Sequence, residues 1–152
     1  FLSAGYGQYD CGCTMLRLTE SGGKITVSSE FVHPTSVFGT MQQTPILYDG
    51  HLFGVRMDKQ LVCLDLQGNV VWTSTSANTF GSGPYTIADG LLYLLDDSGV
   101  LTIVEPSPAG YNQLAQAEVL DGVECWGPMA IASGRLILRD LTRLVCLDIA
   151  AQ

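Results

Sequence analysis

Basic residues are scarce in this 152-residue chain: 7 Lys and Arg stand against 15 Asp and Glu, which gives a formal net charge of −8 at pH 7. Proteins that bind nucleic acids or anionic membranes carry clustered Lys and Arg to neutralise phosphate groups. Because the sequence has no such cluster, we exclude nucleic acid as a partner. No apolar run approaches the ~18 residues that a membrane-spanning helix needs, and we therefore expect no membrane insertion.

Histidine is also scarce, since His33 and His51 are the two in the chain. A hydrolase of the Ser-His-Asp type needs a histidine within reach of an activated nucleophile. No nucleophile motif adjoins either histidine, so the sequence gives no sign of this chemistry. We expect a protein that binds rather than one that catalyses.

Five cysteines are too few and too scattered for an internal disulfide framework, and an odd number cannot all pair within the chain. We expect free thiols, buried for Cys63 and Cys146 because both stand in matching apolar VCLD segments. A disulfide that involves Cys11, Cys13 or Cys125 is one alternative. A zinc site at Cys11-Gly12-Cys13 is another, although such sites usually have a second cysteine pair. No metal is expected.

Apolar residues and glycines are abundant, and they recur in a repeat of about 40 to 45 residues. One marker of the repeat is a hairpin glycine, found at Gly50, Gly90 and Gly134. The second marker is an acidic residue at the end of a strand, found at Asp65, Glu105 and Asp148. A repeat of this length with short strands is typical of the blades of a β-propeller, each a four-stranded antiparallel sheet.

The stretch from Thr44 to Trp72 is the most complete copy of the repeat. Two-residue turns such as Asp49-Gly50 separate its apolar segments, and its predicted strands cover residues 44–48, 51–56, 61–66 and 69–73. We expect Trp72 to wedge between adjacent blades. Residues 111–120 contain many helix-forming residues, but their place in the repeat predicts an outer strand, with a short helix as the alternative.

The remaining copies are incomplete, and together the chain forms one domain of about three and a half blades. We place the blades at residues 1–36, 37–77, 78–121 and 122–152, with the first strand missing from the first blade and the fourth strand missing from the last. Open sheet edges invite pairing with another chain, so we expect self-association through them. A closed four-bladed ring, with the terminal strands paired in a single blade, is the alternative.

The segment DGHLFGVRMDKQLVCLDLQGNVVW, residues 49–72, resembles the repeat of the pyrroloquinoline-quinone-like (PQQ-like) β-propeller family, with its glycine hairpin, its Leu-Asp strand end and its docking Trp. Residues 105–120 also resemble a segment of bacterial secreted members. The family is typically eight-bladed. The resemblance therefore implies that the chain is the C-terminal portion of a longer bacterial propeller protein, located in the periplasm or outside the cell.

In a propeller of this strand order, the loops between blades and the turns between second and third strands lie on one face. Each loop between blades here carries an aromatic-Gly pair, and aromatic rings can stack on a ligand while glycines let it approach. The alternative is that these aromatic rings plug the central funnel. The turns carry Arg56, Asp58, Lys59, Asp96, Asp97, Arg139 and Asp140. Our candidate binding residues are Phe38, Gln42, Arg56, Phe80, Ser82, Trp126 and Arg139.

We expect a non-catalytic binding or scaffold module that binds a protein or a small ligand at this loop face, without a cofactor. The resemblance also includes PQQ-dependent quinoprotein dehydrogenases, and part of such an enzyme is the alternative, in which PQQ and calcium would bind. These enzymes often carry a disulfide between adjacent cysteines, and no adjacent cysteine pair occurs here. A carbohydrate-binding propeller is the third interpretation.

Overall fold

The computed structural model describes residues 1–5 and 11–150, which form fourteen β-strands and no helix. The sequence also predicts a turn over residues 10–13. Asp10 lies outside the described residues, and Gly12 and Cys13 belong to the strand that follows. The strands are arranged in four antiparallel sheets, and within each sheet neighbouring strands follow one another along the chain. The protein is therefore all-β, and its sheets are the blades of a partial propeller.

The strands follow the order expected from the repeat. Blade 1 contains β1 (Leu2–Ala4), β2 (Gly12–Ser21) and β3 (Lys24–His33). Blade 2 contains β4 (Ile46–Tyr48), β5 (His51–Val55), β6 (Leu61–Asp65) and β7 (Val70–Thr73). Blade 3 contains β8 (Tyr85–Ala88), β9 (Leu91–Leu95), β10 (Val100–Val104) and β11 (Gln113–Glu118). Blade 4 contains β12 (Ala130–Ala132), β13 (Arg135–Arg139) and β14 (Leu144–Asp148). Strand β11 confirms the predicted outer strand over residues 111–120.

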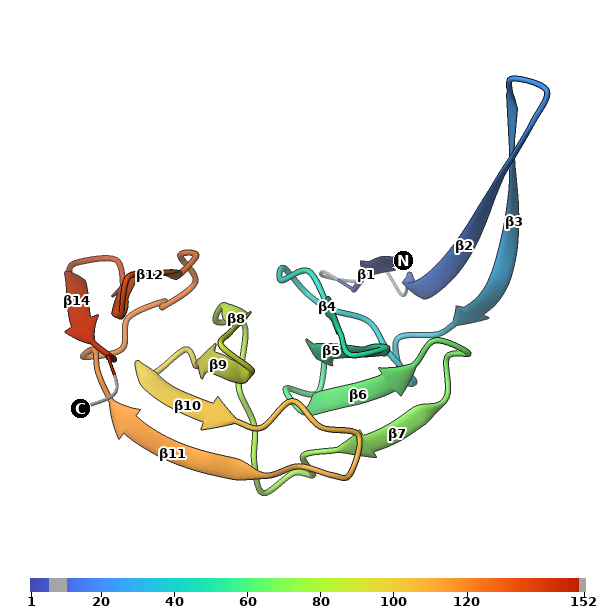
Figure 1. Ribbon diagram of the computed structural model, residues 1–152. Coiled ribbons are helices and arrows are strands. Elements are labelled where there is room, and N and C mark those ends of the chain that lie inside the picture. Colours follow the sequence, from blue (N-terminus) through green and yellow to red (C-terminus); the bar gives the residue numbers. More distant parts are fainter. Residues whose placement is uncertain (6–10, 151–152) are drawn as a thin grey trace.

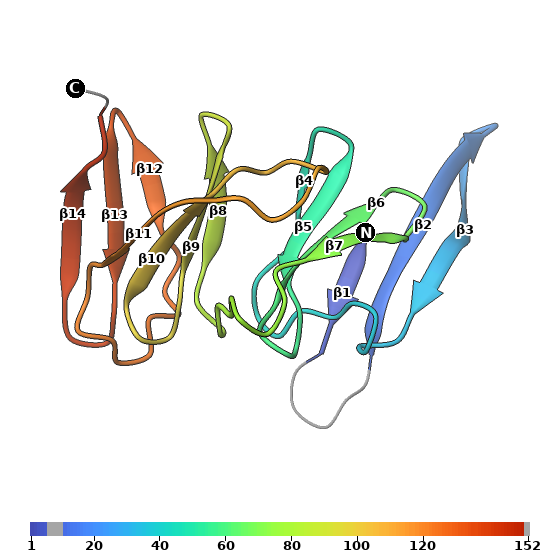
Figure 2. The same ribbon diagram turned by 90° about the horizontal axis from the view of Figure 1, so that it is seen from below.

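The four blades stand side by side along an arc, with the first strand of each blade on the inner side and the last on the outer side (Figure 1). Turned by 90°, the blades form a row of upright sheets, with blades 1 and 4 at opposite ends (Figure 2). Strand β1 pairs with β2 and strand β14 pairs with β13, in separate sheets. The alternative of a four-bladed ring closed by the terminal strands is therefore wrong.

Tight turns give the sheets their regular hairpins. Asp49 and Gly50, between β4 and β5, have φ values of 44° and 72°, and the Asp89-Gly90 and Ser133-Gly134 turns repeat this pair of positive values. A two-residue hairpin turn with positive φ at both positions matches the twist of its strands. The carboxylate of Asp65 closes β6, because its Oδ1 accepts hydrogen bonds from the backbone N–H groups of Gln67 at 2.9 Å and Asn69 at 2.8 Å.

The core consists of apolar clusters between successive blades. Blades 1 and 2 enclose Cys13, Phe38, Leu52, Val62 and Leu64. Blades 2 and 3 enclose a cluster that includes Phe53, Leu61, Cys63, Leu92 and Val104. Blades 3 and 4 enclose a cluster that includes Tyr93, Leu95, Leu101, Leu136 and Leu138. An inner blade therefore buries both of its faces, which explains why strands such as LLYLL are almost wholly apolar.

Trp72 takes the predicted position between two blades. Its ring lies 6.0 Å from the ring of Phe53 in its own blade and 6.3 Å from that of Tyr111 in blade 3. Its Nε1–H donates a 2.8 Å hydrogen bond to the carbonyl oxygen of Ser107, also in blade 3. The indole thus contributes both apolar contact and one directed bond to this junction.

The described cysteines are free thiols. Cys63 is buried as predicted, and burial raises its pKa to about 12. Burial likewise raises the pKa of Cys13 to about 11. The prediction of a buried Cys146 is wrong, because its thiol is exposed. It lies on the face of blade 4 that points away from blade 3, and no other sheet of residues 1–5 and 11–150 packs on that face.

We predict that Trp72→Ala lowers the free energy of unfolding by about 2–3 kcal/mol, since it removes half-buried ring contacts and leaves the Ser107 carbonyl without its donor. Urea denaturation followed by far-UV circular dichroism measures the change. Val70→Ala, on the same strand at 41% exposure, is the matched control and should cost less than ~0.5 kcal/mol. Equal losses in both variants would contradict a docking role for Trp72.

Candidate functional site at the loop face

The loops between blades and the turns between second and third strands do meet on one face. In blade 2, Nη1 of Arg56 donates to the carbonyl oxygens of Ser36 and Val37, both at 3.3 Å. In blade 4, the N–H of Leu141 donates to the carbonyl oxygen of Val123 at 3.2 Å. Each bond joins a turn to the loop that leads into the same blade. We call this side of the molecule the loop face.

Two of the three predicted aromatic residues are buried beneath this face. Phe38 is fully buried in the cluster of blades 1 and 2, and Gly54 makes room for its ring. Phe80 is 5% exposed in the cluster of blades 2 and 3. Neither side chain can contact a ligand from solvent in this conformation. Each ring packs in the apolar cluster between two blades.

Trp126 differs from them, since it remains 40% exposed. Its indole Nε1–H donates a 2.9 Å hydrogen bond to Oδ1 of Asp97, a residue of the blade 3 turn. The same oxygen accepts a 2.8 Å bond from the backbone N–H of Ser82, and Oδ2 lies 3.6 Å from Nζ of Lys59 in blade 2. Asp97 therefore joins groups from three blades and fixes the orientation of an exposed aromatic ring.

Arg56, Gln42 and Ser82 surround a small hollow between blades 2 and 3. The guanidinium group of Arg56 is held by both carboxylate oxygens of Asp58, at 3.0 Å and 2.6 Å. This pairing lowers the pKa of Asp58. The Ser82 hydroxyl donates a hydrogen bond to the sulfur of Met41, with 3.5 Å between Oγ and Sδ. The hollow has a volume of about 10 Å³, room for little more than one water molecule.

Arg139 and its neighbour Asp140 complete the loop face at blade 4. Arg139 is exposed, and its side chain passes beside Gly127, where a Cβ atom would lie 2.6 Å from Nε. Asp140 is buried at 3% exposure. Its Oδ1 accepts bonds from the N–H groups of Thr142 and Arg143, both at 2.7 Å, and these bonds hold the pKa of Asp140 below its ordinary value.

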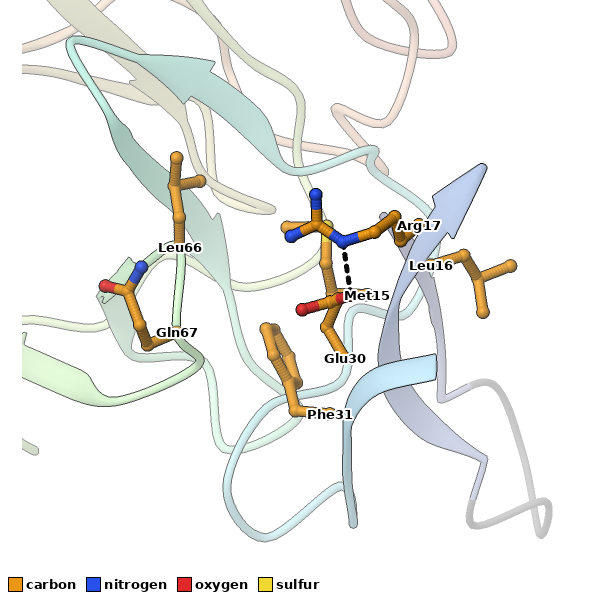
Figure 3. Close-up of a pocket in the computed structure, with 7 residues that line it drawn as sticks. All are labelled: Met15, Leu16, Arg17, Glu30, Phe31, Leu66 and Gln67. Carbon is orange, nitrogen blue, oxygen red and sulfur yellow. Dashed lines mark hydrogen bonds and ion pairs between the residues drawn. The ribbon is translucent and has the colours of Figure 1, made fainter. Parts of the chain in front are cut away.

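Gln42 also lines a second hollow, of about 270 Å³, together with Phe1, Leu2 and Ser3. Two larger hollows lie elsewhere, on the two faces of blade 1. One, of about 480 Å³, opens between blade 1 and the β6–β7 turn, and Figure 3 shows Phe31 and the Arg17–Glu30 ion pair on one side of it and Leu66 and Gln67 on the other. Nε of Arg17 lies 2.6 Å from Oε1 of Glu30. The other hollow, of about 390 Å³, lies on the opposite face. Neither hollow could be predicted from the sequence, because both depend on how far the β2–β3 ribbon extends.

The structure thus brings together Gln42, Arg56 and Ser82 around one hollow. Trp126 and Arg139 form a separate group at blade 4, with Trp126 on the loop that enters this blade and Arg139 at the end of β13. We named Asp97 among the charged turn residues but assigned it no role from the sequence. His33 and His51 bond to backbone oxygens of Gly68 and Asp49, both at 2.8 Å. In the described part of the chain, no three His, Cys, Asp or Glu side chains are grouped as metal ligands.

No family model matches this sequence, and no curated protein sequence matches it. Among solved structures, BamB from Moraxella catarrhalis is similar, with a TM-score of 0.62 and 13% identity over 78% of this chain and 33% of that chain. AztD from Citrobacter koseri is similar with a TM-score of 0.54 and 15% identity over 98% of this chain and 43% of that chain. Myxococcus xanthus glutaminyl cyclase is similar with a TM-score of 0.51 and 13% identity over 89% of this chain and 57% of that chain.

These identities are low, so the similarity shows the fold and nothing finer: the chain has the fold of part of a β-propeller. The chain spans about a third to somewhat over half of the length of these solved structures. Over residues 1–5 and 11–150, no helix is long and apolar enough to span a membrane.

We predict that Asp97→Ala releases the indole of Trp126, because it removes the acceptor of the Nε1 bond. In a Trp72→Phe background, fluorescence anisotropy of Trp126 should fall and acrylamide quenching should rise, while stability changes by less than about 1 kcal/mol, since the pairs of Asp97 are partly exposed. Lys59→Gln is the control and should leave Trp126 fluorescence unchanged. If Trp126 showed the same anisotropy and the same quenching in Asp97→Ala as in the Trp72→Phe parent, the orienting role of Asp97 would be contradicted.

We predict that Asp140→Asn lowers stability in a pH-dependent way. A carboxylate whose pKa is lowered by folding stabilises the protein above its unfolded pKa of about 3.9, and this stabilisation disappears as pH falls through the lower, folded value. The difference in the free energy of unfolding between wild type and Asp140→Asn should therefore be largest near neutral pH and shrink below pH ~4. Urea denaturation at several pH values tests this, with Asp89→Asn on an exposed turn as the matched control.

Proposed function

We propose that this chain is a non-catalytic binding module of an exported bacterial PQQ-like propeller protein, and that it binds a protein partner at its loop face. The observation that carries the proposal is the exposed indole of Trp126, which Asp97 holds in a fixed orientation. The periplasmic or extracellular location and the PQQ-like type rest on the sequence resemblance.

Trp126 has the properties of an anchor in a protein interface. Tryptophan and arginine are enriched among the residues that dominate binding energy, and a preformed orientation reduces the entropy lost on binding. Trp126 is 40% exposed, and Arg139 is exposed nearby on blade 4. Lys59 and Gln42, both exposed, would form part of a polar rim on blade 2.

Neither of the two hollows that Gln42 lines reaches the usual volume of a small-molecule site, which favours a protein partner. Sites for small molecules usually have volumes of ~300–1,000 Å³. The hollow beside Gln42, Arg56 and Ser82 has about 10 Å³, and the other hollow that Gln42 lines has about 270 Å³. A tricyclic quinone such as PQQ does not fit beside Arg56, and the candidate stacking rings of Phe38 and Phe80 are buried. We therefore prefer the scaffold interpretation to the dehydrogenase.

A peptide library selected against the chain tests the proposal. We predict that selected peptides lose at least ~30-fold in affinity on Trp126→Ala, as expected for a central anchor worth about 2 kcal/mol, and a smaller factor on Arg139→Ala, as expected for a rim charge. Isothermal titration calorimetry gives the affinities. Leu114→Ala, an exposed apolar change on the outer strand β11 (51% exposed), is the control.

Peptides whose affinity is unchanged by Trp126→Ala would refute the loop face as the binding site. The same variants distinguish the carbohydrate-binding interpretation. One outcome is that the wild type selects no peptides but binds glycans on an array, and that the Trp126→Ala variant no longer binds them. In that case the indole contacts a sugar, and the protein-binding proposal is wrong.

A further inference from the structure

A hollow of about 270 Å³ opens at the outer side of the junction between blades 2 and 3. Asn78 and Thr79, on the loop that leaves β7, form one side of it, and Tyr111 with Gln113 and Gln116 of β11 forms the other. Figure 1 shows β7 and β11 on the outer side of the arc. Blades 1 and 4 lie on either side of this junction, so neither end of the chain takes part in the hollow.

The lining of this hollow is polar and uncharged. Its seven described residues include three with side-chain amides and two with hydroxyl groups, and none of the seven is charged. Burial raises the pKa of the Tyr111 hydroxyl, so this group also stays neutral at physiological pH. The hollow therefore offers hydrogen-bond donors and acceptors without an ion that would select a charged ligand.

A β-bulge places Gln113 and Gln116 on the same side of β11. Gln113 pairs with Val104 of β10 and Gln116 pairs with Thr102, whereas Leu114 has no partner in this register. In a regular strand, residues three apart point to opposite faces, and the inserted residue removes this difference. Cross-strand partners share a face, and Val104 is buried in the cluster between blades 2 and 3. Both glutamines therefore lie on the side of β11 that faces blade 2.

Each of the three amides is fixed at one end and unpaired at the other. Nδ2 of Asn78 donates to a backbone carbonyl oxygen of its own loop, and Nε2 of Gln116 donates to Oγ1 of Thr102, both at 3.1 Å. Oε1 of Gln113 accepts the Tyr111 hydroxyl at 2.9 Å. Among the described residues, the other end of each amide has no hydrogen-bond partner. The anchored ends restrain the free ends, which reduces the entropy lost on binding a ligand.

Both sides of the hollow are tied to buried parts of the blade junction. Ser74, which is 2% exposed, donates from its hydroxyl to the backbone carbonyl oxygen of Asn78 at 2.6 Å. On the other side, the ring of Tyr111 lies 6.3 Å from that of Trp72 and 6.2 Å from that of Phe80. The hollow therefore keeps its shape without a ligand.

We propose that this hollow binds one unit of an uncharged glycan. Hydroxyl groups both donate and accept hydrogen bonds, and the free amide ends supply a donor at Gln113 and acceptors at Asn78 and Gln116. The volume lies below the ~300–1,000 Å³ of sites that enclose a whole small molecule. It suits a single sugar ring whose neighbours in the glycan remain in solvent.

Charge and lining narrow the class of ligand. The formal charge of −8 on the chain disfavours acidic glycans. A peptide usually anchors through an aromatic or Arg side chain, and the lining has no carboxylate to pair with an Arg. The site does not include Trp126 or Arg139, so this proposal is independent of the one for the loop face.

Nuclear magnetic resonance of the full chain tests the proposal, with the neutral hexasaccharides of maltose, cellobiose, chitin and mannan type as probes. We expect at least one to bind with a dissociation constant on the order of 1 mM, the affinity that ~12 non-hydrogen atoms of one ring give at ordinary ligand efficiency. The side-chain amide signals of Asn78, Gln113 and Gln116 should shift on binding. Added salt should not change the affinity, because no charged group takes part.

Two isosteric variants locate the site. Gln113→Met and Gln116→Met keep the length of the side chain and remove its hydrogen bonds, so each should weaken binding at least ~fivefold. Gln67→Met makes the same chemical change on the exposed turn between β6 and β7, and should leave the affinity unchanged. Far-UV circular dichroism establishes that all three variants remain folded.

The proposal is wrong if the amide signals of Asn78, Gln113 and Gln116 respond to none of these hexasaccharides, or respond only to selected peptides. It is also wrong if glycan binding survives both substitutions in β11 but disappears on Trp126→Ala, which would place the glycan at the loop face. That last result would contradict the protein-binding proposal as well, whereas a lack of response to the hexasaccharides leaves it intact.

Discussion

The structure depends on one constraint: a sheet that is apolar on both faces must be covered on both. A hairpin or a single blade cannot satisfy it, because alternate residues of the strands point to opposite sides and both sets are hydrophobic. The protein satisfies it by stacking blades, with Phe53 and Cys63 on one side of blade 2 and Leu52 and Leu64 on the other. Trp72 adds a directed bond to a junction that is otherwise non-directional.

The sequence predicted the strands well because they depend on local chemistry. Hairpin turns at Gly50, Gly90 and Gly134 require positive φ, and the short apolar segments between turns leave one register per hairpin. The sequence could not distinguish Phe38 and Phe80 from Trp126, because all three stand in aromatic-Gly pairs and only packing decides their exposure. The same holds for Cys63 and Cys146, which share the motif VCLD but not the neighbouring blade.

Asp97 shows why a candidate site is harder to predict than a fold. Its partners Lys59, Ser82 and Trp126 come from three different blades, so no local pattern in the sequence links them. Fold similarity does not supply the missing information either, since similar solved structures include both BamB and a glutaminyl cyclase. A propeller provides a rigid frame, and the side chains at its loops determine what that frame does.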